Sequence, residues 1–154
     1  MRLTFSSSDY RNADLADESG RVLYTTHTTS FGKNMAIRKH TGGSLGGSEE
    51  LAVINWHVFR SDEIRFGGQV IKADDMFTQR CDRHFIGPDG CAYKWKLSLS
   101  NVNCLQPEDS QDQLAKSHDR NFGIRSPSHP PYLEISPSVT HILDYIIVTF
   151  VYVK

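Results

Sequence analysis

The amino-acid sequence predicts a mainly β fold, in which an antiparallel barrel or a strongly curved sheet wraps around a buried C-terminal helix. Short runs rich in β-branched and aromatic residues recur along the chain, with turn-forming residues between them. One run, over residues 93–100, alternates apolar and polar side chains, as a strand with one buried face does. The longest apolar run, residues 142–153, is too short to cross a bilayer, so we expect it in the core.

The length and net charge of the chain limit its domain number and its possible partners. A chain of 154 residues is the usual size of one domain, so we expect a single domain over residues 1–154, with residues 1–20 as a candidate flexible segment. The 17 Lys and Arg residues and 18 Asp and Glu residues give a net charge of −1. This balance does not produce the global positive field of proteins that grip nucleic-acid phosphates, although a local basic patch is compatible with it.

The N-terminus lacks an apolar core of the length that a secretory signal requires, and no segment is apolar over the length that a membrane span requires. We therefore expect a cytoplasmic protein without a transmembrane segment, monomeric, and able to act peripherally at membranes. The three cysteines include no Cys-x-x-Cys pair, which argues against a disulfide framework and a zinc ribbon. Cys81 and Cys91 face each other across a predicted hairpin, so reduced thiols and a bond between them both remain open.

Strands are expected wherever β-branched and aromatic residues lie between turn signals. The first half of the chain has five such runs, with Gly67 and Gly68 as the hairpin turn between the last two. The glycine-rich residues 41–48 lack the ending of a phosphate-binding P-loop and are expected to form a mobile loop. The five predicted strands are residues 21–29, 35–39, 51–58, 63–66 and 69–72.

The clearest hairpin lies at residues 83–99. Pro88 presets the first turn position, Asp89 suits the second, and Gly90 can adopt the left-handed conformation that ends the turn. After the turn, Tyr93 and Trp95 fall on the face that we expect to be buried.

The last third of the chain contains two predicted loops. Residues 107–116 are polar and acidic, and residues 125–131 are stiffened by prolines. Residues 132–135 read as a short strand. The final run, residues 141–154, has the β-branched content of a strand, but it follows Ser and Thr caps and is apolar nearly all round, which favours a fully buried helix.

The run 85–90 with residues 93–96, followed by the apolar run 142–153, resembles a large family of small fungal proteins of uncharacterised function. That family is similar to the tubby C-terminal, LURP-one and phospholipid-scramblase barrels, in which a hydrophobic C-terminal helix threads the barrel. The resemblance spans the chain from about residue 21 onward. It implies a tubby-like (LURP-one-like) fold and carries fold better than function, because one fold hosts many activities.

A basic strand face is the first candidate site. Lys94 and Lys96 lie on the face opposite Tyr93 and Trp95. Clustered with basic residues of neighbouring strands, they would bind an anionic lipid headgroup or an inositol phosphate, as the tubby resemblance implies. The plainer interpretation is a solubilising polar face, and a protein partner is also compatible. The predicted ligand-binding residues are Lys94, Lys96, Arg80, Arg83 and Arg65.

Two histidine clusters give the alternative, a small phosphodiester-cleaving enzyme of ribonuclease type acting on RNA. If residues 80–84 and 117–121 converged, His84 and His118 could serve as acid and base. Mixed charges next to loops are also ordinary solvated surface. The candidate catalytic residues are His84, His118, Asp82, Asp119, Arg83 and Arg120.

The seven histidines show no metal-ligand spacing, since none lies two or four residues from another. We therefore expect no metal and no cofactor. The sequence favours a non-catalytic binding module over the enzyme, because it contains no nucleophile motif.

Overall fold

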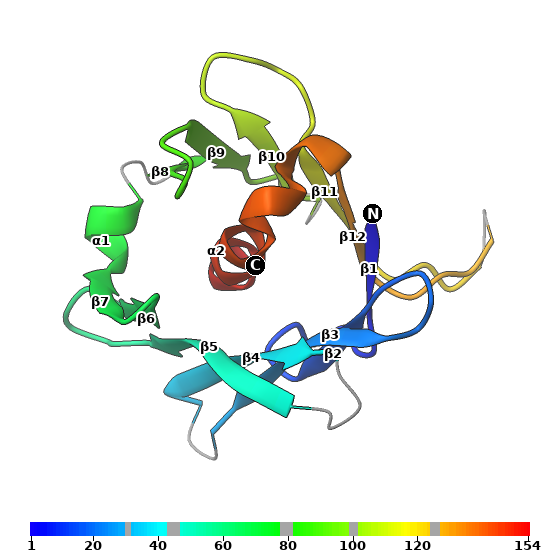
Figure 1. Ribbon diagram of the computed structural model, residues 1–154, viewed down its shortest axis with the longest axis horizontal. Helices are drawn as coiled ribbons and strands as arrows, with labels where there is room; N and C mark the ends of the chain where they lie inside the picture. The colour runs from blue at the N-terminus through cyan, green and yellow to red at the C-terminus, as the bar shows by residue number, and fades with distance from the viewer. Residues whose placement is uncertain (30–31, 43–46, 78–81, 99–101, 124–126) are drawn as a thin grey trace.

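The computed structural model describes residues 1–29, 32–42, 47–77, 82–98, 102–123 and 127–154. In this part of the chain, twelve strands form one antiparallel sheet that curls around a C-terminal helix (Figure 1). The strands of the first half are β1 (Arg2–Phe5), β2 (Ala13–Ala16), β3 (Val22–Thr28), β4 (Asn34–Thr41), β5 (Gly47–Asn55), β6 (Glu63–Phe66) and β7 (Gln69–Lys72). Those of the second half are β8 (Asp82–Ile86), β9 (Ala92–Lys96), β10 (Cys104–Pro107), β11 (Ala115–His118) and β12 (Tyr132–Ile135).

The sheet is strongly curved but not closed. Its strand order is β7-β6-β5-β4-β3-β2-β1-β12-β11-β10-β9-β8, so β7 and β8 are its two edges. A short helix, α1 (Ala73–Met76), connects these two edges along the chain and lies at the break (Figure 1). This arrangement confirms the predicted curved sheet wrapped on a helix.

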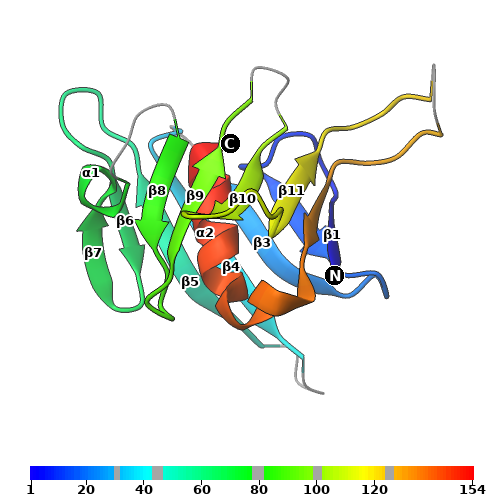
Figure 2. The same cartoon turned by 90° about the horizontal axis from the view of Figure 1, so that it is seen from above.

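The central helix α2 (Leu143–Val153) runs inside the curl of the sheet (Figure 2). A 3₁₀ helix, η1 (Pro137–Ile142), leads into it and is capped by Ser136, whose side chain accepts a hydrogen bond from the Ser138 amide. Residues 146–151 of α2 are all buried, so the predicted buried helix is confirmed. Its β-branched residues are tolerated because surrounding strands bury every side of the helix. Among the described helices, none is long and apolar enough to span a membrane.

Polar contacts fix both ends of α2 to the sheet. At its start, Asp144 accepts a hydrogen bond of 2.6 Å from the Tyr24 hydroxyl and pairs at 2.7 Å with the Lys39 ammonium group. At its end, the Tyr152 hydroxyl donates to Asp62 at 3.1 Å. Burial, together with the Asp62 carboxylate, raises the pKa of Tyr152 to about 12, so this phenol remains a donor at neutral pH.

Residues 1–20, the candidate flexible segment, include two strands of the sheet. Strand β1 lies between β2 and β12 in the middle of the sheet, and Leu3, Phe5 and Leu15 are buried. Strands β1 and β2 have four residues each. Their alternation is too short to stand out against the serines and aspartates between them, and pairing with neighbouring strands holds them in the sheet.

Residues 107–116 are also more ordered than predicted, because β10 and β11 take both ends of this range and leave 108–114 as the loop. The hairpin of β8 and β9 is confirmed, with Gly90 at a φ of 77°. The turn between β6 and β7 is confirmed as well, with φ values of 58° and 76° at Gly67 and Gly68. The predicted mobile loop falls largely on residues 43–46, outside the described residues.

Candidate functional site

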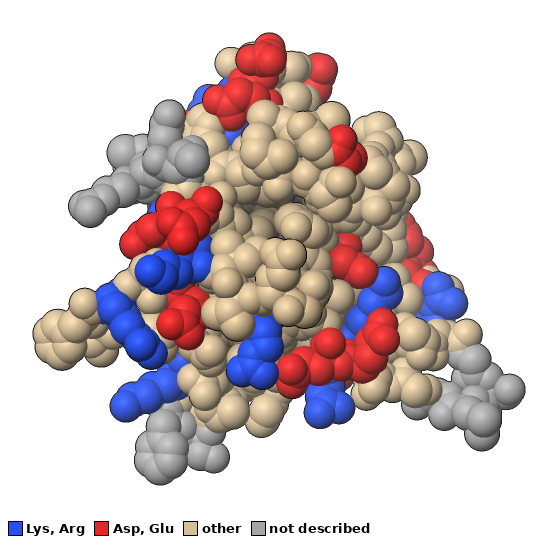
Figure 3. Space-filling model, turned by 60° about the vertical axis from the view of Figure 1, so that its left-hand side comes forward, with Lys and Arg blue, Asp and Glu red and all other residues tan. Residues whose placement is uncertain are grey.

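The break in the sheet between β7 and β8 opens into a cleft of about 420 Å³, which we call the seam cleft. Figure 3, turned so that the side with β7 and α1 comes forward, shows a hollow whose surroundings are mostly uncharged, with charged residues toward the edges. The seam cleft is lined by Ile71, Asp75, Met76, His84, Phe85, Ile86, Ala92, Glu108 and Tyr145.

Apolar side chains from four elements form most of this lining. Ile71 comes from β7, Met76 from α1, and Phe85 and Ile86 from β8. Tyr145 of α2 also lines the cleft, and its ring packs edge-on against Phe66 at 4.7 Å between centroids. Concave and mainly apolar lining with a few polar groups is typical of small-ligand sites.

One imidazole-carboxylate pair stands on the cleft wall. The His84 Nδ1 atom lies 2.6 Å from Glu108 Oε2, and the His84 side chain is only 15 % exposed. A carboxylate at this distance favours a proton on Nδ1 and leaves Nε2, which has no hydrogen-bond partner among the described residues, for a ligand. The pair therefore gives an otherwise apolar cleft one oriented polar group.

The loop after β10 holds Glu108 in place. The Glu108 amide donates to the Ala92 carbonyl at 2.9 Å, and the Lys94 ammonium group donates to the Glu108 carbonyl at 2.8 Å. Farther along, the Gln106 side-chain amide donates to the Gln111 carbonyl at 3.2 Å. These bonds fold residues 108–111 back toward the outer face of β9 and β10.

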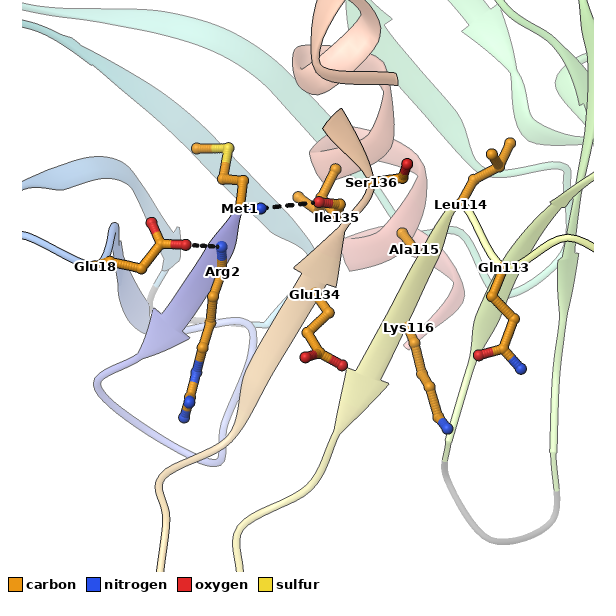
Figure 4. A pocket seen from close by; sticks show the side chains of 10 residues that line it. All are labelled: Met1, Arg2, Glu18, Gln113, Leu114, Ala115, Lys116, Glu134, Ile135 and Ser136. Atoms are coloured by element: carbon orange, nitrogen blue, oxygen red, sulfur yellow. Dashed lines mark hydrogen bonds between the residues drawn. The ribbon is translucent and has the colours of Figure 1, made fainter. Parts of the chain in front are cut away.

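A second hollow of about 370 Å³ lies along β1, β12 and β11. Figure 4 shows Arg2, Glu134 and Lys116 extending from three adjacent strands in the same general direction, with the Met1 amine bonded to the Ile135 carbonyl at 3.1 Å. Cations and anions alternate across this hollow, so its charges are matched within the protein. It offers less apolar surface than the seam cleft, which we take as the better candidate.

The β8–β9 turn carries a polar cluster of its own. Asp89 accepts hydrogen bonds from the Tyr93 hydroxyl at 2.7 Å and pairs with His141 Nε2 at 3.0 Å. These partners, the Tyr93 bond first, lower the pKa of Asp89 from its usual 3.8 to about 2. Gly87 is required here, because a Cβ at this position would lie 2.6 Å from an Asp89 carboxylate oxygen. The cluster fastens the turn to η1.

The predicted basic patch is only partly assembled. Lys94 and Lys96 do lie together on the outer face of β9, where Lys96 is exposed and Lys94 is engaged by the Glu108 carbonyl. Arg65 is exposed on β6, on the other side of the break in the sheet. Arg80 lies outside the described residues.

Arg83 does not lie on the same face as Lys94 and Lys96. Arg83 pairs with Trp95 across β8 and β9, and its guanidinium carbon lies 5.9 Å above the Phe77 ring on the inner side of the sheet. Strand alternation explains this placement, because Arg83 is two residues from the buried Phe85.

The two candidate catalytic histidines do not share a site. His84 is on β8 and His118 is on β11, with β9 and β10 between them. Three strand spacings of about 4.8 Å, and an offset of four residues of about 3.3 Å each, separate them by about 20 Å. That exceeds the span of about 10 Å that one phosphate could bridge.

The other members of the two clusters also diverge. His118 Nε2 pairs with Glu134 at 2.8 Å, whereas Asp119 accepts bonds of 2.9 Å from the Tyr10 hydroxyl and the Lys154 ammonium group. Arg120 lies 5.3 Å from the Phe122 ring. Asp82 lies beside Lys96 in the β8–β9 register. Each partner set is local, so the predicted clusters are separate surface features.

Sequence reasoning missed Glu108 and Tyr145. Glu108 stood in a polar stretch without periodicity, and Tyr145 stood in the apolar terminal run. No local pattern marks either residue, because the pairing of β9 with β10 and the insertion of α2 bring them to the cleft.

In the part of the chain that the structure describes, no three His, Cys, Asp or Glu side chains lie close enough together to hold a metal ion. Cys91 and Cys104 carry free thiols. Cys81, the other half of the considered pair, lies outside the described residues.

Comparison with known proteins gives one match. A family model described as a family of unknown function, DUF6593, matches residues 8–154. The chain belongs to this family. No curated protein and no solved structure gives a significant match. The DUF6593 match includes every residue that lines the seam cleft, and the relation to tubby-like barrels and the fungal origin stay predictions.

Proposed function

We propose that this DUF6593 chain is a non-catalytic binding module that holds the apolar part of an amphiphilic lipid in the seam cleft. The observation that carries the proposal is a mainly apolar cleft of about 420 Å³ with one oriented pair, His84 and Glu108, on its wall. Apolar lining supplies affinity, and a single polar group fixes the orientation of a ligand. The tubby-like relation, a cytoplasmic location and a monomeric state belong to the same proposal.

An anionic headgroup fits the rim nearest β9. Lys94 is the β9 neighbour of His84 in the register, and Lys96 follows on the same outer face. Each basic residue near an anionic surface contributes about 1 kcal/mol. Lys94 is already bonded to the Glu108 carbonyl, so Lys96 is the freer cation. An inositol phosphate alone would use this rim without filling the cleft.

A protein partner is the second candidate, favoured by the free edges of the sheet. Among the described strands, β7 and β8 each pair with one neighbour, and edge strands can pair with an extended segment of another chain. An added strand beside β8 would place its side chains over the same cleft. Extended apolar peptides are therefore the competing ligand class.

The ribonuclease hypothesis stays a prediction without an assembled pair of histidines. The hypothesis would be supported if the wild-type chain cleaved RNA and if His84→Ala or His118→Ala abolished that cleavage.

The test is a fluorescence titration with cis-parinaric acid, a fatty acid whose emission rises in an apolar site. Ala92→Leu adds bulk to the cleft lining, whereas Ala36→Leu adds the same bulk on the half-buried outer face of β4. We expect saturable binding to the wild type and to Ala36→Leu, and at least about tenfold weaker binding to Ala92→Leu, since a filled site loses apolar contact. No saturable binding to the wild type, or equal affinity for all three chains, would reject the proposal.

A further inference from the structure

Two loops present bare apolar side chains. In the segment between β5 and β6, Val58 is 86 % exposed and Phe59 is 100 % exposed. In the segment between β11 and β12, Phe122 is 78 % exposed. A single exposed apolar residue is ordinary, but a completely exposed Phe beside an exposed Val is costly in water. We call Val58, Phe59 and Phe122 the apolar tips.

Both loops lie at the same end of the sheet. Neighbouring strands are antiparallel throughout, so β5 and β11, six places apart in the strand order, run in the same direction and end on the same side. The last turn of α2 contacts both loops, because Tyr152 bonds to Asp62 and Lys154 bonds to Asp119. Figures 1 and 2 show the two loops on opposite sides of the C-terminal end of α2, an end that we call the mouth.

Basic side chains accompany the apolar tips. Arg60 follows Phe59 directly, is 68 % exposed and lies 3.9 Å from the Glu63 carboxylate. The Arg120 guanidinium lies 5.3 Å from the Phe122 ring. Arg11, in the neighbouring β1–β2 segment, is exposed as well. An arginine beside an exposed aromatic ring is the pairing expected at the boundary between lipid headgroups and acyl chains.

The acidic residues of the mouth are mostly engaged by the protein itself. Asp62 accepts bonds from the His57 amide and the Tyr152 hydroxyl. Asp119 is bonded to Tyr10 and Lys154. Asp9 accepts from Asn12, while Asp74 and Asp75 are exposed on α1 beside the break in the sheet. Glu63 lies 3.9 Å from Arg60, but the Arg60 and Arg120 side chains are both exposed, so they can contact an anionic surface.

We infer that the mouth docks on a lipid bilayer, with the apolar tips inserted at the headgroup level and Arg60 and Arg120 against anionic lipids. This deepens the proposed function, because a module that collects a lipid from a membrane must first dock on it. Two separate tips on opposite sides of the mouth suit a flat bilayer better than the continuous apolar patch that a protein partner buries.

The test is co-sedimentation of the full chain with vesicles of phosphatidylcholine mixed with phosphatidylserine, and with vesicles of phosphatidylcholine alone. The double variant Phe59→Ser with Phe122→Ser removes both aromatic tips. Val70→Ser is the matched control, because Val70 is 65 % exposed on β7, away from the mouth. We expect the double variant to lose at least about tenfold in vesicle affinity and Val70→Ser to match the wild type. Mixed vesicles should bind more strongly than neutral ones.

Titration with cis-parinaric acid without vesicles separates this inference from the proposed function. The double variant should retain wild-type affinity for the probe, whereas Ala92→Leu should lose probe binding and still sediment with vesicles. Loss of both activities in the double variant at unchanged thermal stability would show that the tips belong to the cleft, and would overturn docking as a separate step.

Depth of insertion gives a second readout. Phe59→Trp should show a blue-shifted emission and quenching by brominated lipids on mixed vesicles, whereas Val70→Trp should show neither. The inference fails if the wild type does not sediment with mixed vesicles, if Val70→Ser is impaired as much as the double variant, or if the tryptophan at position 59 stays water-exposed on bound protein. Failure to sediment would favour a protein as the partner of the tips.

Discussion

The Trp95 indole Nε1 donates a hydrogen bond of 2.9 Å to Thr149 Oγ1, which joins β9 to the middle of α2 inside the core. Both side chains are fully buried. The Thr149 hydroxyl also donates to the Tyr145 carbonyl at 2.7 Å, within the helix. The bond between Trp95 and Thr149 fixes the rotation of α2 about its axis, and that rotation places Tyr145 at the seam cleft.

Replacing Trp95 with Ala should lower the free energy of unfolding by about 3 to 5 kcal/mol, because the change leaves a large cavity against Phe150. Trp95→Phe should cost less, since it mainly removes the bond to Thr149. Urea titration measures both changes. A loss below about 1 kcal/mol for Trp95→Ala would contradict burial of this residue.

Ile147→Asp should prevent soluble expression of a folded chain. Ile147 is fully buried in α2, and an unpaired carboxylate there costs more than a margin of stability of about 5 to 15 kcal/mol can absorb. Truncation after Ser138 should have the same effect, while Val70→Asp on exposed β7 should fold. A folded, monomeric truncate would show that α2 is peripheral to the core.

Asp89→Asn should destabilise the chain by about 1 to 2 kcal/mol at neutral pH, through weaker bonds to Tyr93 and His141. The Asp89 pKa is depressed to about 2 from a usual 3.8, so the stabilisation is complete above about pH 4 and is lost as the pH falls toward 2. Thermal unfolding of the wild type and of Asp89→Asn across this pH window should show the difference in stability becoming smaller as the pH falls. A constant difference down to pH 2 would exclude the carboxylate as its source.

Lys96→Glu combined with Lys94→Gln should weaken binding to vesicles that contain phosphatidylserine by about tenfold or more, since each basic residue contributes about 1 kcal/mol. Arg38→Glu, exposed on the distant β4, serves as the charge-reversal control. Binding to the wild type should also fall as salt rises, because surface charges are screened beyond about 8 Å at physiological ionic strength. Equal losses in the variant and the control would indicate only a net-charge effect.

The fold was predictable where turn chemistry and periodicity agree. Pro88, Asp89 and Gly90 locate the β8–β9 turn, and the alternation from Tyr93 to Trp95 gives the buried face of β9. The four-residue strands β1, β2, β10 and β11 were missed, because their formation depends on pairing with neighbouring strands rather than on local pattern.

The candidate site was much less predictable. His84 was identified, but its partner Glu108 lies 24 residues away on a loop whose position depends on β10. The inward orientation of Arg83 could have been deduced, because Arg83 lies two residues before the aromatic Phe85 and strand residues two apart share a face. No sequence pattern marks the gap between β7 and β8, because the gap results from how far the twelve-stranded sheet curls around α2.

Photo-crosslinking with a fatty acid that carries a diazirine near the end of its chain shows directly whether a lipid chain occupies the seam cleft. After illumination, mass spectrometry locates the labelled residues. We expect labels concentrated on residues that line the seam cleft, above all Ile71, Met76 and Ile86, and we expect unlabelled fatty acid to compete them away. Labels spread over the outer surface, or confined to the apolar tips, would contradict a lipid site in the cleft.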